Sequence, residues 1–205
     1  MRAVAWTILL CACGGPPKGS PDGGDAFDSG APPDTGPEPT GCYDVPIELT
    51  GGFGHYGEPF EPAPPVGAVA TMVHGIQGPF WHIDTGIRLT SVHTSVSARP
   101  TVTLVSSGAL ISGRLGGTTT NESFLQLAPE GECAGSSVAL RAFLDDVDPD
   151  EAVVEELVPH ICPLDGEEVD ITWEVRDLVD QRTATATVRA TLALDPVDVP
   201  TCAAR

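Results

Sequence analysis

Two histidines and an aspartate that could bind a metal ion lie in one short stretch, HGIQGPFWHID, which runs from His74 to Asp84. Imidazole nitrogens and carboxylate oxygens are common ligands of Zn²⁺. His82 and Asp84 are two residues apart, so on a β-strand they project from the same face. The glycines and the proline in the middle favour a turn between two strand-like flanks. The stretch therefore predicts a β-hairpin, and a metal site is the alternative interpretation.

The register of this hairpin decides whether His74 joins the other two groups. With a five-residue loop, His74 shares a face with His82 and Asp84. With a four-residue loop, His74 shares a face with Trp81 instead. We prefer the five-residue loop because it places Trp81 with Val73 on the inner face. Even in that register we expect no tight site, because an exposed sheet face offers few groups to hold the ligands in place.

A second candidate for cation binding is the acidic run that starts at Asp145. Asp146, Asp148 and Asp150 match the D-x-D-x-D opening of a calcium-binding loop. Glu151, however, stands where such a loop needs glycine. An irregular calcium site and an exposed acidic loop both fit this run, and we prefer the loop.

Enzyme motifs are missing from the chain. It contains no G-x-S-x-G elbow, no H-E-x-x-H zinc motif, no phosphate-binding loop and no dinucleotide fingerprint. We therefore expect no enzyme and no cofactor. The formal net charge of −19 excludes nucleic acid as a partner, because nucleic-acid binding needs a basic face.

The elements that must position these residues are β-strands. Apolar and polar residues alternate without a break from Val169 to Arg176, and residues 183–194 are rich in threonine and valine. Such alternation is typical of strands that are buried on one face. Several further short runs of the same kind, separated by turn residues, predict an all-β domain.

The last two strands, VDITWEVRD and TATATVRATLAL, resemble the closing hairpin of immunoglobulin-like sandwiches in bacterial surface proteins. The number of short strands and their alternation predict an antiparallel β-sandwich of this immunoglobulin-like type, and we expect Trp173 to lie in its core. The antibody-type Cys–Trp–Cys order is absent. A protein or glycan ligand would be expected at loops of the sandwich.

The first residues, MRAVAWTILLCACGG, indicate export. The apolar run AVAWTILL is far shorter than the ~20 residues that a membrane-spanning helix needs, and it fits a secretory signal. The sequence Leu10-Cys11-Ala12-Cys13 resembles the lipobox of bacterial lipoproteins. The resemblance implies a signal peptide over residues 1–12 and lipidation of Cys13. Gly14 in the next position implies an outer-membrane location in the cell envelope.

Residues 13–41 form a linker rich in glycine, proline and aspartate, which we expect to be disordered. The domain then covers residues 42–205. Its four cysteines predict two disulfides with three alternative pairings, and we prefer Cys133–Cys162 with Cys42–Cys202. No spacing typical of a closed zinc site occurs among them.

Together these features predict a lipid-anchored, extracytoplasmic module with a structural or binding role. The expected partners are the membrane, through the lipid anchor, and a protein or glycan ligand at the loops. A metal-binding lipoprotein (zinc or calcium) is the first alternative, and a hydrolase of unrecognised type is the second.

Overall fold

The computed structural model describes residues 43–74, 81–112, 122–144 and 158–203. The expected signal peptide, linker and calcium-like loop lie outside these ranges, and with them Cys13, Cys42, Asp146, Asp148 and Asp150. Within these ranges no helix has both the length and the apolar character needed to cross a bilayer.

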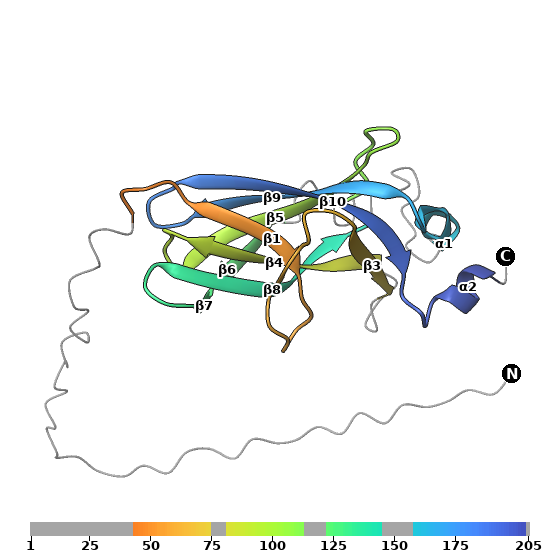
Figure 1. The fold of residues 1–205 in the computed structure, drawn as a ribbon, viewed down its shortest axis with the longest axis horizontal. Helices are drawn as coiled ribbons and strands as arrows, with labels where there is room; N and C mark the ends of the chain where they lie inside the picture. The colour runs from red at the N-terminus through yellow and green to blue at the C-terminus, as the bar shows by residue number, and fades with distance from the viewer. Residues whose placement is uncertain (1–42, 75–80, 113–121, 145–157, 204–205) are drawn as a thin grey trace, which may run out of the picture. The chain divides into compact units, whose positions relative to one another are not determined.

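β-Strands dominate the described part of the chain (Figure 1). In chain order they are β1 (Glu48–Phe53), β2 (Glu61–Pro62), β3 (Ala68–His74), β4 (Trp81–Thr90), β5 (Ser95–Leu104), β6 (Ser123–Gln126), β7 (Ala128–Pro129), β8 (Ala134–Phe143), β9 (Glu168–Asp177) and β10 (Thr183–Leu194). The helical pieces are short: α1 (Val158–Ile161), the 3-10 turn η2 (Cys162–Leu164) and α2 (Val199–Ala203). The predicted all-β class is confirmed.

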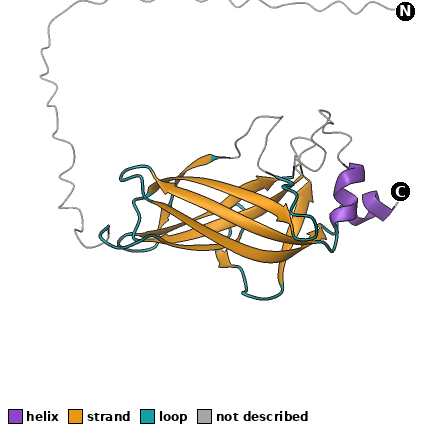
Figure 2. Ribbon diagram, turned by 90° about the horizontal axis from the view of Figure 1, so that it is seen from above, coloured by secondary structure: helices purple, strands orange, loops and turns teal. Residues whose placement is uncertain are grey.

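The strands form one curled sheet (Figure 2). Its main path runs β2-β1-β4-β3-β10-β9-β5-β6, while β8 pairs with the other edge of β4 and with β7. The described pairings are antiparallel except for that of β3 with β10. Because the sheet curls, β9 faces β4 across the core. The indole N–H of Trp173 on β9 donates to Oγ1 of Thr85 on β4 at 3.1 Å.

The core is built by the alternation seen in the sequence. On β9, Val169, Ile171, Trp173 and Val175 are buried, and the residues between them lie on the outer face. Burial of each large apolar side chain contributes roughly 1.5–3 kcal/mol. The expected core position of Trp173 is therefore confirmed.

Gly51 on β1 provides the room that Trp173 needs. A β-carbon at this position would overlap the indole ring of Trp173. We expect Gly51→Ala to lower the free energy of unfolding by about 1–3 kcal/mol, the usual effect of overpacking. Urea unfolding measures it, with the exposed neighbour Thr50→Ala as the control that should stay within about 0.5 kcal/mol of wild type. Equal stability of Gly51→Ala and wild type would contradict this account of the core.

A disulfide joins Cys162 of η2 to Cys202 of α2, so both expected pairings, Cys133–Cys162 and Cys42–Cys202, are wrong. The reason lies in the β9–β10 hairpin, which brings the chain after β10 back beside the residues that precede β9. Both helices accordingly lie at the same end of the sheet (Figure 2). Cys133 is also disulfide-bonded, as expected for the cysteines of this domain.

Candidate functional site

His82 and Asp84 project from the same face of β4, as the sequence predicts. His82 Nε2 lies 3.3 Å from Asp84 Oδ1. The second oxygen of Asp84 binds a histidine from the connection between β1 and β2, because His55 Nδ1 lies 2.8 Å from Oδ2. One carboxylate is thus held between two imidazoles that are 27 residues apart (82 − 55).

His74 does not join this group, so the five-residue register is wrong. In the β3–β4 pair His74 lies opposite Trp81, and Met72 lies opposite Ile83. His74 instead stacks on the Trp81 ring, with 4.9 Å between ring centroids, and its Nδ1 lies 3.9 Å from an oxygen of Asp198.

The physical reason is the parity of the hairpin. Six residues, 75–80, separate the paired His74 and Trp81, and an even number reverses the faces relative to an odd one. Met72, fully buried, therefore takes the inner position that was expected for Val73. The four-residue loop predicted the same face for His74 as the structure shows. Loops of four and six residues differ by two residues, which is one full period of a strand, so they place side chains on the same faces.

The charge of Asp84 is balanced by its neighbours. Burial by itself raises the pKa of Asp84, but hydrogen bonds and attraction from His82 and His55 outweigh it, so the pKa is lowered. The guanidinium of Arg141 supplies a positive charge beside them, with its Nε 3.7 Å from Oδ1. The carboxylate therefore stays ionised and is already engaged by protein groups, which favours a structural role for it.

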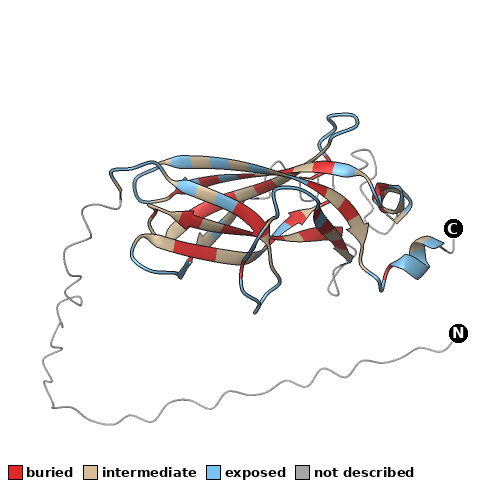
Figure 3. Cartoon of the chain, in the orientation of Figure 1, coloured by how far each residue is buried: buried red, intermediate tan, exposed pale blue. Residues whose placement is uncertain are grey.

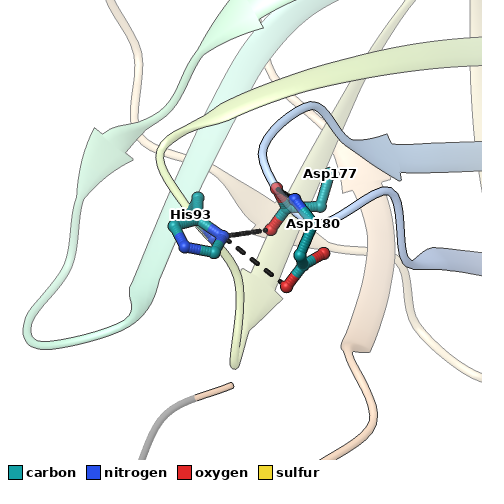
Figure 4. Close-up of side chains that lie close together, drawn as sticks. All are labelled: His93, Asp177 and Asp180. Carbon is teal, nitrogen blue, oxygen red and sulfur yellow. Dashed lines mark hydrogen bonds and ion pairs between the residues drawn. The ribbon is translucent and has the colours of Figure 1, made fainter. Parts of the chain in front are cut away.

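A second cluster, His93, Asp177 and Asp180, forms where the connection between β4 and β5 meets the β9–β10 turn (Figure 4). His93 Nδ1 lies 2.8 Å from Asp177 Oδ2 and 3.7 Å from Asp180 Oδ2. One ligand atom from each of the three lies within 4.8 Å of the others, a spacing that a metal ion could bridge. The sequence did not identify this group, because 84 residues separate His93 from Asp177.

Asp177 is the centre of this cluster, and its oxygens are occupied. The carboxylate is fully buried and accepts hydrogen bonds from the backbone N–H and the ring of His93, at 2.9 and 2.8 Å. It also accepts from the N–H groups of Val179 and Asp180 in its own turn. These bonds connect the β9–β10 turn to the residues just before β5.

The electrostatics of the second cluster agree with a structural tie. Burial raises the pKa of Asp177, and the hydrogen bonds from His93, Val179 and Asp180 outweigh that effect, so the pKa is lowered. Arg182 Nε lies 2.6 Å from Asp180 Oδ2. A cation is thus already present beside the carboxylates, which makes this an unfavourable place for a metal ion.

Comparisons with known proteins add little to this picture. No family model matches the chain, and no curated protein sequence matches it either. Among solved structures, the CooA pilin subunit from enterotoxigenic Escherichia coli aligns with a TM-score of 0.32 and 12% sequence identity, over 72% of this chain and 99% of the pilin chain. A similarity of that size carries no argument about function, so function must be argued from the residues themselves.

Proposed function

We propose that the chain is an outer-membrane lipoprotein, anchored through Cys13, whose β domain is a structural or binding module and not an enzyme. The observation that carries the proposal is the disulfide Cys162–Cys202, together with the bonded Cys133. Disulfides of this kind persist in oxidising compartments outside the cytoplasm. The lipobox-like Leu10-Cys11-Ala12-Cys13 supplies the means of attachment.

The absence of catalysis is supported by how the polar groups are used. Two histidine–carboxylate pairs among the described residues, His55–Asp84 and His93–Asp177, connect loops to strands. In each pair the carboxylate also interacts with further protein groups. Such bonds stabilise the fold, which supports a structural or binding role for the domain.

The immunoglobulin-like assignment belongs to the same proposal. It is supported by antiparallel pairing along nearly the whole sheet and by the strict alternation of β9. The two faces of such a sandwich would meet across the core where Trp173 reaches Thr85.

The anchor is tested by replacing Cys13 with serine. We expect Cys13→Ser to lose incorporation of an alkyne-labelled fatty acid and to move from the membrane fraction to the soluble fraction, because each buried CH₂ of the lipid contributes about 0.8 kcal/mol to membrane binding. The matched control is Cys11→Ser, two residues earlier in the signal, which should keep both the label and the membrane location. Lipid labelling of Cys13→Ser would refute the assignment.

A further inference from the structure

A groove of about 580 Å³ lies on the outer face of the sheet, over β4 and β8. One wall is the connection between β1 and β2, which is exposed over much of its length (Figure 3). The other wall is formed by β6, β7 and the turn that follows them. The volume lies within the range of about 300–1,000 Å³ that is usual for small-molecule sites.

Two glycines fix the first wall against the sheet. A β-carbon on Gly54 would lie 2.7 Å from Cγ1 of Val138 on β8. A β-carbon on Gly86 of β4 would lie 2.9 Å from the ring of Phe60. The connection therefore rests directly on β4 and β8, and Phe60 at its end is only 7% exposed. A wall packed in this way is preorganised, which limits the ordering cost of binding.

Tyr56 stands on this wall with its side chain in solvent. Its exposure is 92%, the highest among the large hydrophobic residues that the structure describes as exposed. An exposed aromatic ring beside a groove offers a flat apolar surface together with a hydroxyl, a combination that is enriched where proteins bind partners.

The floor and the second wall of the groove together carry an oriented set of polar groups. Arg88 Nε lies 2.7 Å from Glu130 Oε2, and Ser136 Oγ donates to Glu130 Oε1 at 2.5 Å. The Arg88 guanidinium also lies over the Phe60 ring, 4.9 Å from its centroid. The side-chain oxygen of Gln126 accepts a hydrogen bond from Ser95 at 3.0 Å. This bond fixes the amide group and leaves its NH₂ as the donor end.

These groups define the chemistry of the ligand. Arg88 and Glu130 neutralise each other, and they present donors and acceptors side by side. A sugar hydroxyl both donates and accepts, so it matches such a pair. An anionic ligand is disfavoured by the formal net charge of −19.

We propose that this groove binds a neutral saccharide. One sugar ring stacks on Tyr56, and its hydroxyls hydrogen-bond to Arg88, Glu130 and Gln126. The inference rests on the proposed binding role of the domain and gives that role a ligand class.

A second hollow, of about 350 Å³ over β5, β9 and β10, provides an internal comparison. It also holds an arginine–glutamate pair that joins adjacent strands, Arg99 with Glu174. None of the described residues that line it is aromatic. The second hollow therefore has an arginine–glutamate pair like that of the proposed site but lacks an aromatic ring on which a sugar could stack.

The test uses the full-length protein in detergent and the probes chitotriose, cellotriose, maltotriose and mannotriose. Saturation-transfer NMR identifies which trisaccharide binds, and calorimetry measures its affinity. We expect Tyr56→Ala and Glu130→Gln each to weaken binding about tenfold. The matched controls Glu174→Gln, from the second hollow, and Val179→Ala, an exposed apolar residue outside the groove, should bind as wild type does. Thermal unfolding verifies that Tyr56→Ala folds normally.

Three outcomes would overturn the inference: no binding of any of the four trisaccharides, loss of binding in Glu174→Gln with retention in Glu130→Gln, or binding of a peptide library in the groove in place of sugars. None of these outcomes affects the lipidation assay on Cys13. Failure of the saccharide site and failure of the anchor can therefore be told apart.

Discussion

Asp177→Ala is expected to lower the free energy of unfolding by about 3–5 kcal/mol, the range for breaking a buried charged network by removing one partner. In the wild-type protein the backbone N–H groups of His93 and Val179 donate to the carboxylate at 2.9 and 2.8 Å. The variant removes this acceptor. It also releases the ring of His93. Urea unfolding followed by tryptophan fluorescence measures the change.

The milder variant Asp177→Asn tests the electrostatic part of this stabilisation. Because the pKa of Asp177 is lowered in the folded protein, its ionised form contributes stability in full above the unfolded pKa of about 3.9. That contribution is lost as the pH falls through the folded pKa. We therefore expect the difference in unfolding free energy between wild type and Asp177→Asn to be smaller at about pH 3 than at about pH 7.

The control for both variants is Asp170→Asn. Asp170 forms an ion pair with Arg189 on the outer face of the sheet, where the expected loss is at most about 1 kcal/mol. An effect of Asp177→Ala no larger than that of Asp170→Asn would show that the buried carboxylate does not stabilise the turn.

The alternation of apolar and polar residues was enough to predict β9 and its core positions, because a period of two depends only on local sequence. The β9–β10 hairpin was predictable for the same reason. The face that His74 occupies was not, because it depends on whether the turn before Trp81 holds an odd or an even number of residues. Glycine and proline in that turn show that the chain reverses, and they do not settle the count.

The cluster around Asp177 was beyond sequence reasoning for a different reason. His93 reaches it only because β5 pairs with β9, which places Val96 opposite Asp177. A pairing between strands that are so far apart in the chain is decided by the packing of the whole domain. One local signal was present: an aspartate at the end of a strand, followed by the turn LVDQ, is suited to accept the N–H groups of that turn.

The disulfide pairing could have been argued from the sequence with one further step. A hairpin of β9 and β10 brings together the residues just before the first strand and just after the second. Gly166 N–H donates to Leu192 O, and Leu192 N–H donates to Glu167 O, so the two ends are side by side. Cys162 and Cys202 lie just beyond those ends, with 5.5 Å between their Cα atoms.

The Cys162–Cys202 bond therefore cross-links the two ends of the β9–β10 hairpin. We expect its removal to cause a second large decrease in the free energy of unfolding. The bond spans 40 residues, and cross-links that close loops of this order stabilise proteins by about 2–4 kcal/mol, mainly by restricting the unfolded chain. We expect the double variant Cys162→Ala/Cys202→Ala to lose that amount in urea unfolding. Before substitution, neither cysteine should react with a thiol reagent in the native, unreduced protein.

The comparison that isolates the bond is between the double variant and wild-type protein treated with a reductant. Reduction also opens the bond of Cys133, so reduced wild type should be less stable than the double variant. If the double variant were as stable as oxidised wild type, packing of the hairpin ends through Leu192 and its neighbours would hold α2 in place without the cross-link. Because α2 has no buried residues of its own, we expect the opposite: without the disulfide, α2 has little to hold it against the hairpin.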